Sequence, residues 1–104
     1  MTRNNFSLSR LQSLLQEIPK GKVTTYAEIA KAMGVPRAAR AVGTLLSKNP
    51  EPDTFPCYKV VRSDGNIGGY ALGTEEKNRR LSAEGISIVN GKIVDREKEV
   101  FRFF

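Results

Sequence analysis

The chain contains one thiol, that of Cys57, and no histidine. Only the thiolate form of a cysteine is a strong nucleophile, and a free thiol has a pKa of about 8.5. The missing imidazole excludes Ser–His–Asp triads, Cys–His dyads and zinc sites built on histidine, and one cysteine forms neither an intrachain disulfide nor a cysteine-rich metal cluster. A lone thiol is typical of a reducing cytoplasm. Cys57 is therefore either a nucleophile or an inert buried thiol, and we expect neither a metal nor a disulfide.

Positive charge is concentrated in one part of the chain. The 104 residues carry 17 Lys and Arg against 11 Asp and Glu, a net charge of +6. Residues 18–48 contain a single acid, Glu28, and the six basic residues of this segment are Lys20, Lys22, Lys31, Arg37, Arg40 and Lys48. A basic segment on structured elements suits a polyanion such as nucleic acid, although an ordinary solvated surface has the same composition.

Length and composition predict a single domain over residues 1–104. With 39% hydrophobic and 27% charged residues the chain has a globular composition. No apolar run approaches the roughly 18 residues that a membrane helix needs. The acid-free start of the chain resembles a transit peptide, but Leu8, Leu11, Leu15 and Ile18 follow a helical spacing. We therefore expect a core helix from about Ser7 to Ile18, stopped by Pro19.

Two short helices follow, separated by a tight turn. Thr25 and Glu28 match a capping box at the start of a helix that ends at Met33 and Gly34. The next helix should run from about Pro36 to Ser47, with Ala39, Val42, Leu45 and Leu46 inward and Arg37, Arg40 and Lys48 outward. This is a helix-turn-helix pattern in which the second helix would be the recognition helix.

The second half of the chain is expected to contain shorter secondary-structure elements. We expect a strand over Tyr58–Arg62, a helix capped by Thr74 and ended by Gly85, and a hairpin of Ile86–Val89 and Lys92–Val94 around Asn90–Gly91. In the tail, residues 95–104, we expect Val100, Phe101, Phe103 and Phe104 to dock on the body or fray. The predicted fold is mainly α with small β-ribbons, an α+β, winged-helix-like domain.

One segment, Pro56-Cys57-Tyr58-Lys59-Val60-Val61, resembles the active-site segment of the O6-alkylguanine-DNA alkyltransferases, whose usual motif reads Pro-Cys-His-Arg-Val. The resemblance extends in order over residues 18–26, 39–43, 49–50, 69–70 and 84–85. It covers about residues 6–94 and corresponds to the C-terminal, DNA-binding and active-site domain of that family. It implies a DNA-repair protein that flips O6-alkylguanine out of duplex DNA and transfers the alkyl group irreversibly to a cysteine, without a cofactor.

The resemblance assigns the reaction to Cys57 as the acceptor thiol, with Glu84 and Asn49 supporting it. Tyr58 stands where the family has the histidine that activates the thiol, and Lys59 stands for the usual arginine. A phenol with a pKa of about 10 is a poor base, so Tyr58 either passes a proton between the thiol and Glu84 or merely fills space.

The resemblance also assigns residues to DNA. Arg40 matches the arginine that replaces the extruded base in the stack, and Tyr26 matches the tyrosine that helps to rotate the phosphate; ordinary phosphate contact and ordinary packing are the respective alternatives. We expect Arg37 and Lys48 to bind DNA as well. The alkylguanine pocket would be formed by Tyr70, Gly69, Pro56 and Val60, with Leu72 narrowing it.

Three functional hypotheses remain from the sequence. The first is a single-turnover alkyltransferase acting through Cys57. The second is a non-catalytic alkyltransferase-like sensor, because such proteins also consist of this domain alone and flag lesions for excision-repair proteins. The third is a winged-helix regulator with an incidental cysteine. In each case we expect a cytoplasmic monomer on nucleoid DNA, without a membrane partner.

Overall fold

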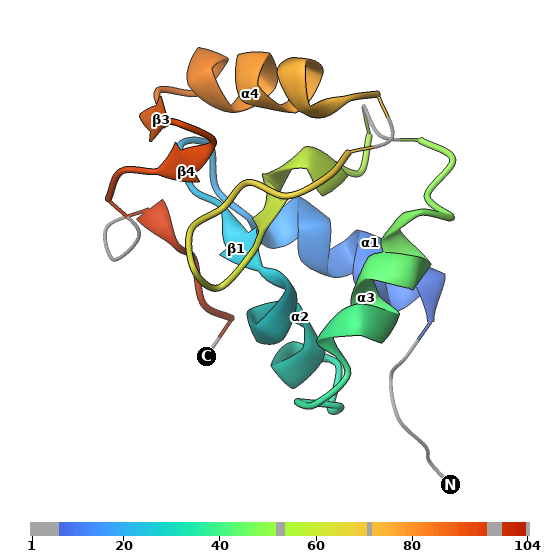
Figure 1. The fold of residues 1–104 in the computed structure, drawn as a ribbon. Helices are drawn as coiled ribbons and strands as arrows, with labels where there is room; N and C mark the ends of the chain where they lie inside the picture. The colour runs from blue at the N-terminus through green and yellow to red at the C-terminus, as the bar shows by residue number, and fades with distance from the viewer. Residues whose placement is uncertain (1–6, 52–53, 71, 96–98, 104) are drawn as a thin grey trace, which may run out of the picture.

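In the computed structural model, residues 7–51, 54–70, 72–95 and 99–103 are described, and they form four α-helices, a short 3-10 turn and two small sheets (Figure 1). The elements are, in order, α1 (Leu8–Glu17), β1 (Thr24–Thr25), α2 (Tyr26–Ala32), α3 (Ala39–Leu46), the 3-10 turn η1 (Cys57–Lys59), β2 (Val60–Val61), α4 (Thr74–Ala83), β3 (Ile88–Val89) and β4 (Lys92–Ile93). The α+β prediction is confirmed.

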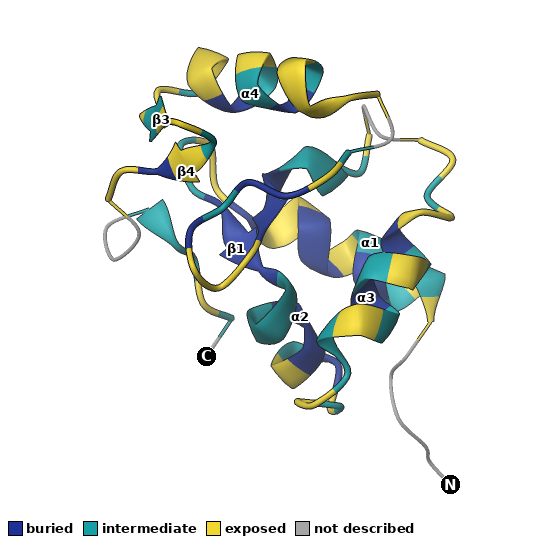
Figure 2. Ribbon diagram, viewed as in Figure 1, coloured by how far each residue is buried: buried dark blue, intermediate teal, exposed yellow. Residues whose placement is uncertain are grey.

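The parallel pair of β1 and β2 separates two hydrophobic cores. Thr24 pairs with Val60 and Thr25 pairs with Val61. Because successive side chains of a strand point to opposite faces, Val60 packs into the core of α1, α2 and α3 while Val61 packs into the core of α4 and the hairpin. In Figure 2 the buried residues gather along this pair and on the inner faces of the helices. The chain just before β2 therefore lies at the boundary of the two cores.

The first helix agrees with its prediction. The Ser7 hydroxyl accepts a hydrogen bond from the Arg10 amide at 3.2 Å, so Ser7 is the N-cap of α1, and Ile18 is its C-cap. Leu11, Leu14 and Leu15 are fully buried or nearly so. The helical spacing thus marked the core face correctly.

Helices α2 and α3 pack against each other as a helix-turn-helix pair, as predicted. Their first turns differ from the prediction in two details. The Thr25 hydroxyl caps α2 by accepting from the Glu28 amide at 3.0 Å, as predicted. The Glu28 carboxylate pairs with Lys31 and Arg102 instead of completing a capping box. The predicted start of α3 at Pro36 is wrong: the Ala38 amide bonds the Val35 carbonyl in a turn, and the helix begins at Ala39 without a side-chain cap.

Two further boundaries differ from prediction. Of the expected strand Tyr58–Arg62 only Val60–Val61 is extended, because the Lys59 amide bonds the Pro56 carbonyl and closes a 3-10 turn. Thr74 is the first residue of α4 and not its cap; the cap position is Gly73, whose φ of 96° favours glycine. The hairpin of β3 and β4 forms around Asn90–Gly91 as expected, with both residues at positive φ and with shorter strands than predicted.

The described part of the tail is docked. Val100 pairs with Val23 beside β1, and the Phe101 amide donates to the Val23 carbonyl. Phe101 and Phe103 pack against the helical core with their rings edge to face, while Phe104 lies outside the described residues. Across the described ranges, no helix has the length and apolar character to cross a membrane.

Candidate functional site

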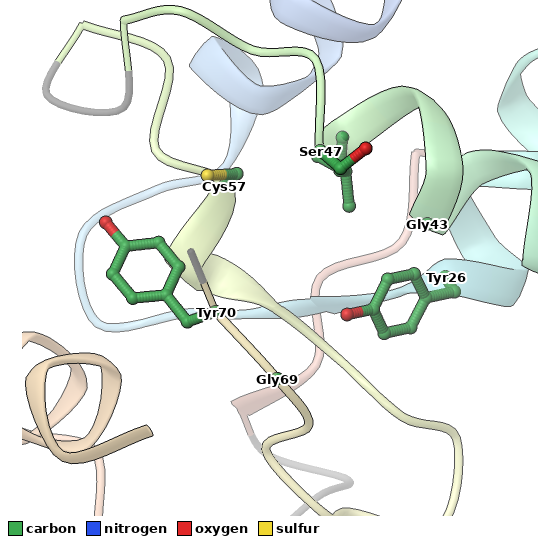
Figure 3. Close-up of a pocket in the computed structure, with 7 residues that line it drawn as sticks. Tyr26, Gly43, Ser47, Cys57, Gly69 and Tyr70 are labelled. Carbon is green, nitrogen blue, oxygen red and sulfur yellow. The ribbon is translucent and has the colours of Figure 1, made fainter. Parts of the chain in front are cut away.

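A pocket of about 240 Å³ opens where α2, α3, η1 and the loop after β2 meet (Figure 3). Cys57 and Tyr70 lie on one side of it, and Tyr26 and the end of α3 lie on the other. The lining is mostly apolar and consists of Tyr26, Gly43, Leu46, Ser47, Cys57, Gly69 and Tyr70. The structure thus brings together four of the predicted site residues (Cys57, Tyr26, Tyr70 and Gly69) around one cavity.

The loop that carries Cys57 into the pocket is held by Asn49. The Asn49 side-chain amide donates to the Phe55 carbonyl at 2.8 Å, and its oxygen accepts from the Glu51 amide at 3.1 Å. The Cys57 amide bonds the same Phe55 carbonyl at 2.8 Å. Asn49 therefore shapes the segment before the thiol, and its contacts are to backbone and to the Gln12 side-chain amide, 3.4 Å away, rather than to sulfur.

Tyr58 and Lys59 share one carboxylate, that of Glu84. The Tyr58 hydroxyl donates to Glu84 Oε2, Lys59 Nζ lies 2.9 Å from Oε1, and the Gly21 amide donates to Oε1 at 3.0 Å. Lys59 is buried and also donates to the Pro19 carbonyl at 2.7 Å. The carboxylate thus ties η1 to the turn after α1 and to the end of α4.

This network shifts the pKa values of Tyr58 and Glu84. Burial and the hydrogen bond to Glu84 raise the pKa of Tyr58 far above its usual value, so the phenol keeps its proton. Burial alone would raise the pKa of Glu84, but hydrogen bonds from Tyr58, Lys59 and the Gly21 amide outweigh it and hold the pKa below the ordinary value. At neutral pH Tyr58 is a donor to an ionised Glu84 and not a base.

A buried cation lies near the thiol. Lys77 of α4 is almost fully buried, and its ammonium donates to the Val60 carbonyl at 2.7 Å and to the Gly69 carbonyl at 3.0 Å. It therefore joins the strand after Cys57 to the pocket loop. Burial lowers the pKa of Lys77 to about 8, the charge of the nearby Cys57 thiolate opposes this shift, and Arg62 adds to it.

Sequence reasoning missed Lys77, although its position carried a signal. Lys77 and Leu81 are four residues apart and so share one helix face, and both are buried. A lysine on the apolar face of a helix needs buried acceptors, which the two carbonyls supply. Gly43, Leu46 and Ser47 also line the pocket without having been predicted to.

The two tyrosines next to the thiol meet each other and an arginine. The rings of Tyr58 and Tyr70 pack edge to face with centroids 6.5 Å apart. The Arg80 guanidinium lies 5.8 Å from both centroids and is held there by a 2.7 Å hydrogen bond to Glu76. This cation fixes the aromatic wall of the pocket from the side of α4.

The predicted DNA-binding residues lie on α2, on α3 and in the segments that flank α3, and they do not all line one hollow. The Tyr26 ring packs on α3, where a Cβ at Gly43 would lie 3.7 Å from it, and burial raises the Tyr26 pKa. Arg40 is exposed and lines a second hollow beside the pocket. Arg37 is exposed in the turn before α3 and Lys48 is exposed after its end, both outside the pocket lining.

Three residues expected in or near the pocket lie outside its lining. The Val60 side chain is fully buried in the helical core, and it is the Val60 carbonyl that takes part, through Lys77. Pro56 precedes η1 as its N-cap and is half-buried. Leu72 is 54% exposed and does not narrow the cavity.

Comparison with known proteins identifies the family. The sequence model described as "6-O-methylguanine DNA methyltransferase, DNA binding domain" matches residues 8–86. A Thermoplasma volcanium protein named bifunctional methyltransferase/endonuclease is 53% identical over 103 residues, which are 96% of this chain and 32% of that protein. A Vibrio parahaemolyticus protein named DNA base-flipping protein is 40% identical over 91 residues, 86% of this chain and 91% of that protein.

The fold agrees with solved structures. S. pombe Atl1 in complex with damaged DNA containing O6-carboxymethylguanine superposes with a TM-score of 0.82 at 30% identity, covering 97% of this chain and 99% of that one. Mycobacterium tuberculosis OGT in complex with DNA gives 0.73 at 36% identity over 79% of this chain and 51% of that one. The chain spans about a third of the bifunctional relatives. Its sequence match and its fold show that the chain belongs to the O6-methylguanine DNA methyltransferase family, and the matched part is the DNA-binding domain of that family.

Proposed function

We propose that the protein binds duplex DNA, receives a flipped O6-alkylguanine in the pocket, and transfers the alkyl group to Cys57. The observation that carries this proposal is the Cys57 thiol in the wall of a largely apolar pocket, between Tyr26 and Tyr70. Members of the same family are methylated-DNA–protein-cysteine methyltransferases, and structural neighbours hold alkylated or damaged DNA. We place this activity on the DNA of the cytoplasm.

The transfer step balances without a cofactor. The Cys57 thiolate attacks the alkyl carbon, the new S–C bond forms as the C–O6 bond breaks, and the electron pair passes to O6 of the base. The thiol proton passes to solvent before attack, and the purine, still joined to its sugar, takes up a proton at N1 and becomes guanine. The thioether is stable, so each molecule reacts once.

The surrounding residues support this step in separate ways. The Tyr70 ring lines the pocket as a wall for the base, while its hydroxyl oxygen is buried, and Gly69 lets the loop approach the base. Without an imidazole, a positive charge near the sulfur is that of Lys77, whose pKa the charge of Cys57 raises against the effect of burial. Asn49 and Glu84 act indirectly, because they hold in place the loop and the turn that carry Cys57.

DNA would lie along α2 and α3. Arg40 enters the stack in place of the extruded base, where a planar guanidinium both stacks and donates hydrogen bonds. Tyr26 displaces the adjoining phosphate, and the exposed Arg37 and Lys48 contact the backbone. The exposed side chains of this face carry the charge that a polyanion requires.

A second candidate function is recognition of the lesion without transfer. The observation that favours it is Tyr58, a protonated phenol hydrogen-bonded to Glu84 at the position where a base would activate the thiol. The Vibrio relative of similar length is named a DNA base-flipping protein, and Atl1 covers the chain almost completely. Such a protein would mark the lesion for excision-repair proteins.

Intact mass after incubation with an oligonucleotide duplex that contains O6-methylguanine separates the two functions. Transfer predicts a gain of one methyl group on the parent protein and none on Cys57→Ala. Tight, lesion-selective binding without the mass gain identifies the recognition function. Equal affinity for damaged and undamaged duplex would contradict both and favour a DNA-binding regulator.

A further inference from the structure

A second hollow, of about 370 Å³, adjoins the pocket and differs from it in charge. It shares Tyr26, Gly43 and Gly69 with the pocket. Arg40 at the start of α3 lines it, and so does Arg62 in the loop after β2. We call this hollow the channel. It is lined by two arginines and adjoins a base-sized pocket, so it suits an anion attached to that base.

The position of Arg62 follows from the sheet. Val61 pairs with Thr25, so Arg62 directly follows β2 as Tyr26 directly follows β1. The Arg62 amide donates to the Asn66 carbonyl at 2.9 Å and the Arg62 carbonyl accepts from the Gly65 amide at 3.0 Å, which fixes the backbone at the base of a tight turn. The Arg62 side chain is therefore attached to a backbone position that is fixed by hydrogen bonds.

The Arg62 side chain lies across Gly68 toward Tyr26. A Cβ at Gly68 would lie 3.8 Å from both Cγ and Nε of Arg62 and 3.5 Å from the Tyr26 hydroxyl oxygen. Gly68 has a φ of 76°, so a side chain is disfavoured there on conformational grounds as well. Arg62 and the Tyr26 hydroxyl therefore border the same small patch of backbone at the mouth of the pocket.

The Arg62 guanidinium has no ion pair within the part of the chain that the structure describes. Arg79, Arg80 and Arg102 are all paired with glutamates, and Arg62 is exposed beside the channel. The nearby acid, Asp64, accepts from the Asn66 amide at 2.9 Å. The planar, five-donor guanidinium matches a phosphate in a bidentate manner, and its charge is permanent.

From these contacts we infer that Arg62 binds a backbone phosphate of the lesion strand next to the flipped nucleotide, in the channel that Arg40 also lines. The inference rests on the proposed DNA binding and adds to it a residue that no part of the sequence argument had assigned. With Arg40 in the duplex and Arg62 on the phosphate, the flipped nucleotide is held by both arginines of the channel.

The test measures binding to a duplex that contains O6-methylguanine, with Arg62→Gln, Arg62→Lys and, as a control, Arg79→Gln, which changes an exposed side chain of α4. We expect Arg62→Gln to bind roughly 5- to 10-fold more weakly at about 100 mM salt and to lower the salt slope by about 0.9, the value for one phosphate contact. Arg62→Lys should retain most of the slope, and Arg79→Gln should match the parent.

Neutral methylphosphonate linkages placed singly around the lesion locate the contact. The parent should lose affinity at one position next to the flipped nucleotide, and Arg62→Gln should lose nothing further there. An unchanged salt slope in Arg62→Gln, or equal sensitivity of both proteins at every linkage, would overturn the phosphate contact while lesion-selective binding stands. Absence of lesion-selective binding in the parent would overturn the proposed function and this inference with it.

Discussion

At the scale of single residues, the reactivity of Cys57 depends on what accepts the thiol proton. Tyr58 keeps its own proton and donates to Glu84, so it does not serve as the base. Tyr58→His would introduce an imidazole beside Glu84, and a positioned general base contributes about 10²–10⁴-fold. We expect transfer to become roughly 10-fold faster or more, measured as single-turnover rates between about pH 6 and 8, near the imidazole pKa.

Tyr58→Phe is the matched control for this substitution. It removes the hydroxyl and keeps the ring that packs against Tyr70. If Tyr58 is only a donor to Glu84, transfer by Tyr58→Phe should stay within a few-fold of the parent. A His variant no faster than the Phe variant at every pH would contradict this account.

We expect the charge of Lys77 to be a second determinant of Cys57 reactivity. Lys77→Met keeps the length of the side chain and leaves the Val60 and Gly69 carbonyls without their donor. We expect a loss of about 1–3 kcal/mol of folding free energy, because unsatisfied buried acceptors cost more than removal of the buried charge recovers. We also expect slower alkylation of Cys57 by iodoacetamide at neutral pH.

The pH dependence distinguishes the charge from a packing effect. Lys77 loses its proton near pH 8, so the difference in alkylation rate between parent and Lys77→Met should shrink as the pH rises through that value. The exposed Lys92→Met variant should behave as the parent. A rate difference that is constant from pH 6 to about 10 would show that Lys77 acts only on the fold.

The sequence predicted the members of this site better than their contacts. Cys57, Tyr70 and Tyr26 meet at one pocket because a resemblance over several motifs preserves spacing. Lys77 was missed because its role depends on backbone carbonyls of two distant segments, which its place on the apolar face of α4 does not identify. Val60 was expected in the pocket, but the alternation of β2 sends its side chain into the helical core.

At the scale of elements, Glu84 fastens three of them together. It lies at the C-cap of α4 and bonds Lys59 of η1 and the amide of Gly21 in the turn after α1. Because its folded-state pKa is held below the ordinary value of about 4.3, the ionised form stabilises the fold above that pH. This stabilisation is lost as the pH falls through the folded-state pKa.

Glu84→Gln tests this linkage. We expect the variant to lose about 1–3 kcal/mol at neutral pH, since charge-assisted hydrogen bonds are replaced by neutral ones. Urea midpoints measured from about pH 7 down to pH 3 should converge between variant and parent at the acid end. The exposed Glu75→Gln variant should follow the parent, and a gap that stays constant with pH would contradict the ionised-carboxylate account.

The boundaries of elements show what local sequence determines and what it does not. Thr25 caps α2 because its hydroxyl reaches an amide three residues on, a purely local bond. The start of α3 was misplaced because Pro36 fits a turn as well as a first helical turn, and no capping side chain decides between them. The strand pair β1–β2 joins segments 36 residues apart (24 and 60), so its register was not readable from either one.

At the scale of the whole molecule, the exposed basic residues of α2 and α3 should make DNA binding strongly salt-dependent. Lys31, Arg37, Arg40 and Lys48 are exposed, whereas Glu76 on α4 is neutralised by Arg79 and Arg80. Because of counterion release, each phosphate contact on duplex DNA lowers the logarithm of the affinity by about 0.9 for every tenfold rise in salt concentration. For a few contacts we expect affinity to fall roughly 10- to 100-fold between about 50 and 200 mM salt.

Binding curves at several salt concentrations give the slope directly. The four-residue set should contribute to it, so Arg37→Gln and Lys48→Gln should each reduce the slope without changing the preference for the lesion. Affinity that does not depend on salt would remove the electrostatic role of this face.

The separation of the DNA face from the thiol across the pocket predicts that recognition and chemistry are separable. Arg40 lies in the channel and Cys57 lies in the pocket wall. Extruding a base costs a few kcal/mol in unstacking and unpairing, and in the proposed function Arg40 recovers part of that cost by filling the vacated space. Arg40→Ala should therefore weaken binding to lesion-containing duplex and slow transfer from it, while transfer from free O6-alkylguanine base, which needs no extrusion, should change little.

Cys57→Ala should abolish transfer from both substrates and leave lesion binding intact, and Arg79→Ala on α4 should leave both properties as in the parent. If Arg40→Ala slows reaction with free base and duplex equally, Arg40 supports the pocket or the fold, and its role in base extrusion is wrong.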